Sequence, residues 1–184
     1  CTQALIDEIE AAGGKPVMWK TGHSHIKAKL HELNAELAGE RSGHIFFNEG
    51  YYGFDDALYA AVRLLEYIAS QDKSFAELLE TVPRYVTSPE IAAHCADEVK
   101  YRVVEDLVAE FKKEYGTRVI DINGARVVFD DGWGLVRASS NLPQLVIIFE
   151  AKTEGRVREI RKLFRDKILA HPEVSPEWEN DIYA

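Results

Sequence analysis

The chain has 184 residues, of which 46% are hydrophobic and 29% charged, and its formal net charge at pH 7 is −9. These proportions are typical of a globular protein with one large domain or two small ones. The acidic balance argues against non-specific nucleic-acid binding, which requires a basic surface, and no apolar stretch reaches the roughly 20 residues that cross a bilayer.

The two cysteines and the first residue indicate where such a protein works and how much of it is present. Cys1 and Cys95 form no spaced framework, which suits a reducing compartment, and we expect a cytoplasmic protein. Because the chain starts with Cys1 and not with Met, we expect a piece of a longer polypeptide.

The chain opens with helical and strand patterns in alternation. Apolar residues at helical spacing over residues 5–9 stop at Gly13 and Gly14, which favours a helix that ends there. Residues 17–19 have the pattern of a short buried strand. Ser24 is expected to cap a following helix, whose apolar face is formed by Ile26, Leu30 and Leu33.

Two neighbouring strands, over residues 36–38 and 45–47, are predicted next, joined by the polar loop GERSGH. Asp55 or Asp56 is expected to open an amphipathic helix. The residues of this helix that should face inward are Leu58, Val62, Leu65 and Ile68. Ser74 and Glu77 then form the pattern of a capping box ahead of another helix.

Two prolines without helical periodicity indicate a linker over residues 83–89, so we predict domains over 1–82 and 90–184. The second domain should be a two-layer α+β sandwich. Its predicted helices cover residues 97–115 and the segment after Thr153, and Asn123-Gly124 is expected to form a two-residue hairpin turn. Predicted strands lie at residues 91–95, 119–122, 125–129, from 135 onward, and 145–149. Residues expected inside are Val99, Val103, Leu107 and Phe111, and Val157, Ile160, Phe164 and Ile168.

Three polar loops follow or join apolar strands and are the candidate sites. Lys20 to Ser24 stand between a strand and a helix, where free backbone N–H groups suit an anion. A capped helix start with Lys20 and His23 in solvent is the alternative. In GERSGH, Glu40 and Ser42 are suited to sugar hydroxyls and His44 to general acid–base chemistry, although a plain charged turn explains the same residues.

The third loop has the sequence GWGLVRASSNLP. Arg137 offers a planar, bidentate fork, and Ser139, Ser140 and Asn141 add small hydrogen-bond donors, as a compact phosphate cradle requires. An ordinary turn between two strands also fits Asn141 and Pro143. From the residues alone both interpretations stay open.

Taken in order, KTGHS, GERSGH, YYGFDDALYAAVRLLE and GWGLVRASSNLP resemble the C-terminal part of the α-D-phosphohexomutases, in particular the phosphomannomutase/phosphoglucomutase branch. The resemblance covers nearly the whole chain. It implies part of a three-layer α/β/α sugar-binding domain (domain 3), followed by a two-layer, TATA-box-binding-protein-like phosphate-binding domain (domain 4).

The resemblance also implies roles for individual residues. Glu40 and Ser42 match residues that contact sugar hydroxyls, with Lys20 as a further sugar-binding candidate. His23 and His44 match two histidines of the family's cleft, which transfer a proton or orient the substrate. The residues that match the phosphate-binding loop are Arg137, Ser139, Ser140 and Asn141. The Ser140-Asn141 pair stands where many relatives have Asn-Thr, and Arg41 stands where Met is common.

Members of this family interconvert 6-phospho and 1-phospho forms of mannose or glucose through a bisphosphorylated sugar, with a phosphoserine and Mg²⁺, and a glucose 1,6-bisphosphate-type activator is implied. This sequence contains neither a Ser-His-Asn-Pro-type loop nor an Asp-x-Asp-x-Asp loop, so we expect no metal ligands in it. The expected partners are a phosphosugar and the N-terminal domains of the same protein, with neither nucleic acid nor membrane. The chain alone should be inactive. A non-catalytic phosphosugar-binding or regulatory module, or a domain without a ligand, is the alternative.

Overall fold

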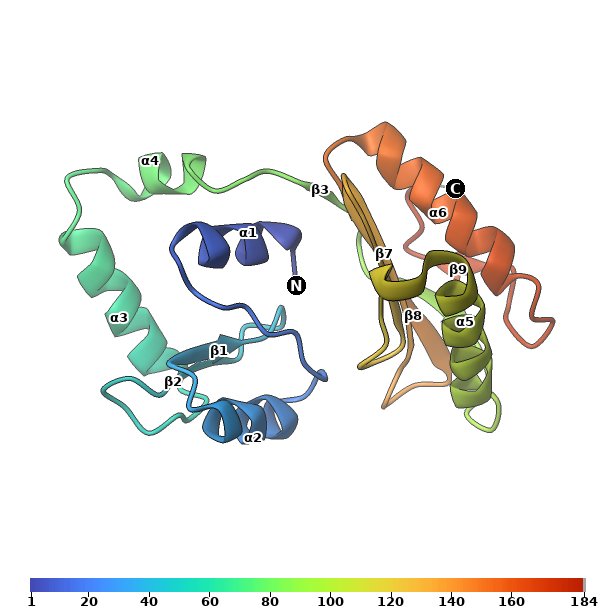
Figure 1. Cartoon of the computed structure of the whole chain (residues 1–184), viewed down its shortest axis with the longest axis horizontal. Helices are drawn as coiled ribbons and strands as arrows, with labels where there is room; N and C mark the ends of the chain where they lie inside the picture. Colours follow the sequence, from blue (N-terminus) through green and yellow to red (C-terminus); the bar gives the residue numbers. More distant parts are fainter. Residues whose placement is uncertain (184) are drawn as a thin grey trace. The chain divides into compact units, whose positions relative to one another are not determined.

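A computed structural model of the chain describes residues 1–183 and contains two compact units (Figure 1). Unit 1 comprises Gln3–Pro83, and unit 2 comprises the described residues from Arg84 onward. Across the described residues, no helix is long and apolar enough to cross a membrane.

Unit 1 begins with two helices, α1 (Gln3–Ala11) and α2 (His23–Leu33). As predicted, α1 ends before Gly13, whose φ of 81° is a conformation that favours glycine. The prediction for Ser24 was wrong: α2 begins at His23, with Gly22 in the N-cap position and no side-chain capping bond. Ser24 therefore lies inside the first turn.

The strand predicted over residues 17–19 is absent from the structure. Residues 14–20 have no regular secondary structure, and Val17 is 52% exposed. A strand exists only when its backbone pairs with a neighbour. Within the part of the chain that the structure describes, no strand pairs with this segment, so its apolar pattern alone does not make it a strand.

The two strands predicted around GERSGH are confirmed as an antiparallel pair, β1 (Leu37–Gly39) and β2 (Ile45–Phe47). Leu37 lies opposite Phe47 and Gly39 opposite Ile45, so the six-residue loop starts at the last residue of β1 and ends directly before β2. The fully buried Phe46 anchors the pair.

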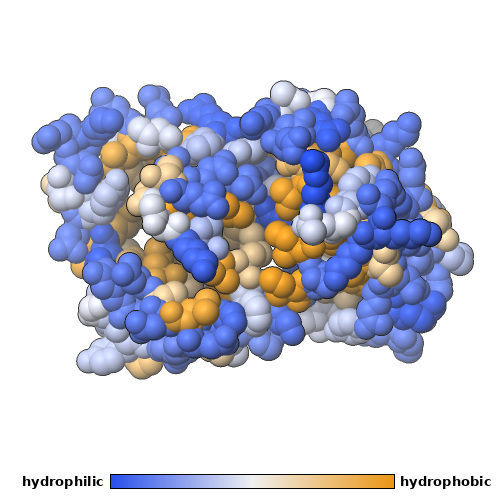
Figure 2. All heavy atoms as spheres, in the orientation of Figure 1, coloured by the Kyte–Doolittle hydropathy of each residue, from blue (hydrophilic) through white to orange (hydrophobic). Residues whose placement is uncertain are grey.

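The helix α3 (Ala57–Ala69) is capped by Asp56, whose carboxylate accepts a hydrogen bond from the Tyr59 N–H at 2.9 Å. The predicted inward face was wrong, because Leu58, Val62 and Leu65 are 81%, 61% and 65% exposed, and Ile68 is half-buried. The helix instead packs on the hairpin through its other face, where the ring of Tyr59 makes an edge contact with Phe47. Apolar atoms are accordingly visible on the surface of unit 1 in Figure 2.

The capping box predicted ahead of the next helix, α4 (Phe75–Glu80), is confirmed. The Ser74 hydroxyl accepts from the Glu77 N–H, and the Glu77 carboxylate accepts from the Ser74 N–H at 2.8 Å. Both bonds satisfy backbone donors that the first turn of a helix leaves free.

Unit 2 is a two-layer α+β domain built on a seven-stranded antiparallel sheet. The strands are β3 (Val86–Thr87), β4 (Ile91–His94), β5 (Val119–Ile120), β6 (Ala125–Phe129), β7 (Gly132–Ala138), β8 (Gln144–Ala151) and β9 (Trp178–Glu179). Their order is β5-β6-β7-β8-β4-β9, and β3 pairs with β8. The long strand β8 is central, as its uninterrupted apolar sequence predicts.

The helices α5 (Lys100–Tyr115) and α6 (Glu154–Ile168) cover one face of this sheet (Figure 1). Their predicted inward rows are confirmed except for Val99, which is partly buried in the N-cap position of α5. The other seven side chains are at most 1% exposed. Thr153 caps α6 by accepting from the Arg156 N–H at 3.2 Å, also as predicted.

Three details of unit 2 differ from the prediction. The connection between β5 and β6 is a four-residue loop over 121–124, because β5 ends at Ile120 and β6 begins at Ala125. Residues 86–87, inside the predicted linker, form β3 and pair with β8. The short strand β9 was missed, since two residues carry too little periodicity to be detected.

Candidate functional site

The first two candidate loops lie side by side in unit 1. The N–H of Gly22, at the start of α2, donates to Glu40 Oε2 in the hairpin loop at 2.9 Å. Gly22 has φ of 122°, so glycine is favoured where the chain turns into the helix. The helix N-terminus therefore holds a carboxylate of the protein itself, which its dipole stabilises.

The second oxygen of the same carboxylate, Glu40 Oε1, is buried and has no hydrogen-bond partner among the described residues. Leaving a buried carboxylate oxygen unpaired costs about 1–3 kcal/mol or more, because water that solvated it has been removed. One oxygen thus fixes the side chain against α2, and the other remains able to accept a bond from a hydroxyl.

The remaining residues of the GERSGH loop form a tight turn. The Gly43 N–H donates to the Glu40 carbonyl at 3.0 Å, and the Glu40 N–H donates to the His44 carbonyl at 2.9 Å. Gly43 has φ of 93°, which this turn requires. Arg41 and Ser42 occupy its corner and are exposed.

The two candidate histidines of unit 1 face each other, with ring centroids 6.0 Å apart. They differ in their partners. His44 Nδ1 lies 2.6 Å from Asp55 Oδ2, whereas His23, at the first position of α2, is exposed. Lys20 is also exposed, and its predicted sugar contact stays a prediction.

The third candidate loop connects β7 to β8 in unit 2. The buried Ser139 hydroxyl accepts from the N–H groups of Asn141, at 3.3 Å, and Leu142, at 3.2 Å. Its N–H donates to the Gln144 carbonyl at 3.0 Å. These bonds fold the loop back on itself and leave the side chains of Ser140 and Asn141 exposed.

Arg137 lies at the base of this loop and is half-buried. Burial lowers the pKa of its guanidinium below the ordinary value, and the charge of Glu90 partly opposes that change. Among the described residues, its side chain donates one hydrogen bond, from Nη1 to the Ala138 carbonyl, and this bond is long at 3.3 Å. A half-buried cation with most of its five donors unused is suited to an anion.

Two residues of these sites were missed by the sequence analysis. Lys100, only 3% exposed in the first turn of α5, donates to the Leu142 carbonyl at 2.9 Å and so supports the third loop from behind. Asp55 was interpreted as a possible helix cap, but its carboxylate is the partner of His44. The sequence did offer a sign of Asp55: since Asp56 alone caps the helix, the adjacent carboxylate was available for another contact. No sequence pattern indicated the role of Lys100.

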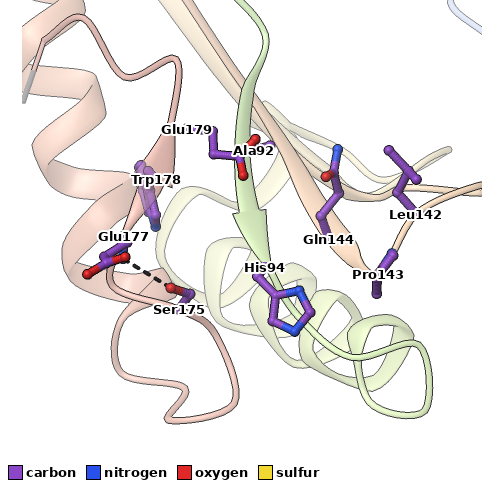
Figure 3. Close-up of a pocket in the computed structure, with 9 residues that line it drawn as sticks. All are labelled: Ala92, His94, Leu142, Pro143, Gln144, Ser175, Glu177, Trp178 and Glu179. Atoms are coloured by element: carbon purple, nitrogen blue, oxygen red, sulfur yellow. Dashed lines mark hydrogen bonds between the residues drawn. The ribbon is translucent and has the colours of Figure 1, made fainter.

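A cavity of about 450 Å³ lies beside the third loop, within unit 2 (Figure 3). Leu142, Pro143 and Gln144 form one wall, and residues of β4, β9 and the segment before β9 form the rest. Neither Arg137 nor Ser140 lines it, so the cavity is separate from the predicted phosphate-binding residues. Across residues 1–183, no three His, Cys, Asp or Glu side chains are grouped to hold a metal ion.

The fold is that of an α/β domain followed by a two-layer α+β domain. Comparison with protein families shows to which family these two domains belong. The family model described as phosphoglucomutase/phosphomannomutase, alpha/beta/alpha domain III, matches residues 1–85. The one described as phosphoglucomutase/phosphomannomutase, C-terminal domain, matches residues 90–167. The chain therefore belongs to the phosphoglucomutase/phosphomannomutase family, as the resemblance of its motifs predicted.

Individual relatives agree with this family. A phosphomannomutase/phosphoglucomutase of Pseudomonas aeruginosa is 42% identical over 170 residues, which are 92% of this chain and 36% of that protein. A phosphoglucomutase of Neisseria gonorrhoeae is 41% identical over 93% of this chain and 37% of its own length. A solved structure of a phosphoglucomutase/phosphomannomutase family protein from Burkholderia thailandensis matches with a TM-score of 0.83 and 40% identity, over 92% of this chain and 36% of that one. The chain thus spans little more than a third of the length of these relatives.

Proposed function

We propose that this chain supplies the sugar- and phosphate-recognising part of a phosphohexomutase. The reaction is the interconversion of 6-phospho and 1-phospho forms of mannose or glucose, through a bisphosphorylated sugar. Family membership supports the class of reaction. The hydrogen-bonding and charged side chains of each unit indicate what that unit binds: the sugar in unit 1 and the phosphate in unit 2.

In unit 1, the observation that carries the proposal is the unpartnered oxygen of Glu40. Gly22 holds the carboxylate in place, and a sugar hydroxyl that donates to Oε1 would satisfy the one oxygen that the protein leaves unpaired. Ser42, exposed on the same turn, adds a hydroxyl that donates and accepts. Neither group distinguishes mannose from glucose by itself, because both sugars carry the matching hydroxyls.

In unit 2, the loop that follows β7 is proposed to bind the phosphate. Arg137 provides a half-buried guanidinium, and Ser140 and Asn141 provide exposed small donors on a turn that is stabilised by hydrogen bonds to the Ser139 hydroxyl. A phosphate that accepts from Arg137 would compensate the burial that lowers the pKa of this side chain.

The phosphoryl donor and Mg²⁺ are not assigned to these residues, since the described part of the chain has no group of side chains that fits a metal ion. In the proposed enzyme they belong to another part of the polypeptide. The chemistry that Mg²⁺ would supply there is neutralisation of charge on the transferring phosphoryl group. The side chains of this chain bind and orient the sugar and its phosphate.

Replacing Glu40 with Gln is expected to weaken binding of mannose 1-phosphate by roughly 1 kcal/mol, about fivefold. The amide keeps the shape of the carboxylate and its oxygen still accepts from Gly22. Its NH2 group then stands where Oε1 was, and this group donates and cannot accept a hydrogen bond from the sugar hydroxyl. The dissociation constant is measured by titration followed by NMR. Glu36→Gln, at an exposed position before β1, is the control and should leave the affinity unchanged. Equal affinities of native and Glu40→Gln chains would remove Glu40 from the site.

The purified 184-residue chain is expected to show no mutase turnover with glucose 1-phosphate, even with Mg²⁺ and glucose 1,6-bisphosphate present. Phosphoryl transfer requires a positioned donor, metal and acceptor together, and this sequence has neither a Ser-His-Asn-Pro-type nor an Asp-x-Asp-x-Asp loop. A coupled assay for glucose 6-phosphate measures the rate. Turnover above that of a heat-denatured sample would contradict the proposal.

A further inference from the structure

The contact between His44 and Asp55 is built into the backbone of unit 1. His44 directly precedes β2, and Asp55 lies in a segment that returns to the same strand, where Asp55 pairs with Phe46 in an isolated antiparallel bridge. The Asp56 N–H also donates to the Ile45 carbonyl at 3.4 Å. These backbone contacts bring the two side chains together and leave His44 Nδ1 and Asp55 Oδ2 2.6 Å apart.

The two neighbouring carboxylates have different tasks. Asp56 caps α3 through Tyr59 and accepts a bond from the Tyr51 hydroxyl at 2.7 Å, and these bonds lower its pKa below the ordinary value. Asp55 caps no helix, and His44 is the partner recorded for its side chain. The capping residue alone explains how α3 starts, so Asp55 is free for a separate task.

A carboxylate that faces one ring nitrogen of a neutral histidine determines which nitrogen carries the proton. Asp55 accepts a hydrogen bond, so Nδ1 of His44 must be the protonated nitrogen, and Nε2 retains its lone pair. The same carboxylate stabilises the imidazolium that forms when Nε2 takes a proton. His23, whose ring centroid is 6.0 Å away, has no carboxylate partner among the recorded ion pairs and hydrogen bonds of the described residues.

We propose that Asp55 is a positioning residue that fixes His44 in the Nδ1–H tautomer and so leaves His44 Nε2 able to take the proton of the sugar hydroxyl. This inference rests on the proposed function and adds the residue that orients its acid–base candidate. When the hydroxyl becomes a nucleophile, its proton moves to Nε2 and its electron pair forms the bond to phosphorus. The bond between phosphorus and the oxygen of the phosphoryl donor breaks, and the donor oxygen keeps that electron pair. The imidazolium returns the proton when the phosphoryl transfer runs in reverse.

The test is the ring tautomer of His44, measured by long-range ¹H–¹⁵N correlation on the ¹⁵N-labelled full chain, at a pH where the ring is neutral. The native chain is expected to show Nδ1–H. Asp55→Asn should shift the ring toward the Nε2–H form, because the amide can also donate to Nδ1. Asp56→Asn is the matched control, since Asn is an equally good helix cap and the Asp56 carboxylate accepts from Tyr51 and Tyr59, whereas His44 is paired with Asp55. An Nε2–H tautomer in the native chain would overturn the proposal without any variant, and so would an unchanged tautomer in Asp55→Asn.

Addition of mannose 1-phosphate to the same sample tests the catalytic assignment separately. The Nε2 resonance of His44 is expected to move while its Nδ1–H remains. Ligand-induced changes at Glu40 with no change at His44 Nε2 would overturn the assignment of His44. A complete lack of response to the ligand in a chain with the expected tautomer would overturn the proposed function, so the two failures are distinguishable.

Discussion

Replacing Arg137 with Ala is expected to weaken binding of mannose 1-phosphate by about 1.5–3 kcal/mol, which is roughly a 10- to 150-fold loss of affinity. The variant removes a half-buried guanidinium whose burial already lowers its pKa. A phosphate bound to it gains charge-assisted hydrogen bonds that water no longer competes for. An NMR titration that follows the amides of the loop after β7 gives the two dissociation constants.

A surface arginine of the same unit provides the control for this loss. Arg118 is 54% exposed and lies 3.5 Å from Asp130, so Arg118→Ala changes the net charge by the same amount as Arg137→Ala. It should leave the affinity within about twofold, because exposed charges are screened by salt. Equal affinities of the Arg137→Ala and native chains would remove Arg137 from the phosphate-binding loop.

Replacing Phe164 with Ala is expected to destabilise unit 2 by about 3–5 kcal/mol, the usual cost of a large cavity in a core. The ring is fully buried on α6 and contacts the rings of Phe111 and Phe149 at centroid distances of 4.5 and 5.5 Å. Urea unfolding measures the loss, followed by tryptophan fluorescence, to which Trp133 and Trp178 of this unit contribute. Tyr101→Ala, at an aromatic side chain of the same unit that is 56% exposed, is the control and should cost far less.

Gly134 provides a second test of the packing around Phe164, because it lies beneath the ring of that residue. A Cβ atom at position 134 would come 2.7 Å from Phe164 Cζ, so Gly134→Ala alone should cost about 1–3 kcal/mol through overpacking. In the Phe164→Ala background the added methyl group occupies vacated space. The double variant should therefore be more stable than the sum of the two single losses predicts. Strict additivity would show that these residues do not pack against each other.

The sequence predicted unit 2 better than unit 1, for a physical reason that the helices illustrate. The rows Val157-Ile160-Phe164-Ile168 and Leu58-Val62-Leu65 have the same kind of spacing, yet the first is buried and the second exposed. Spacing shows which side chains share a face of a helix, whereas burial depends on what covers that face. In unit 2 the sheet beneath α6 is part of the same chain, and for this face of α3 the described residues provide no such cover.

The candidate site shows a similar division. The three polar loops were identifiable because each one gathers its hydrogen-bonding residues within a few positions of the sequence. Asp55 was not, because its meeting with His44 depends on a backbone bridge to β2 from a segment 11 residues away. Lys100 supports its loop from the start of a helix 42 residues away. Contacts of this kind follow from the tertiary fold and have no local signal.

The most direct test of the whole account is a titration of the ¹⁵N-labelled 184-residue chain with mannose 1-phosphate, followed by amide chemical shifts. The account predicts saturable changes in two sets of residues, Gly22 and the GERSGH loop in unit 1 and residues 137–143 in unit 2. Inorganic phosphate should affect the second set alone, because it has no sugar hydroxyls. The absence of a shift change in both sets at millimolar mannose 1-phosphate would contradict the assignment of these loops to phosphosugar recognition.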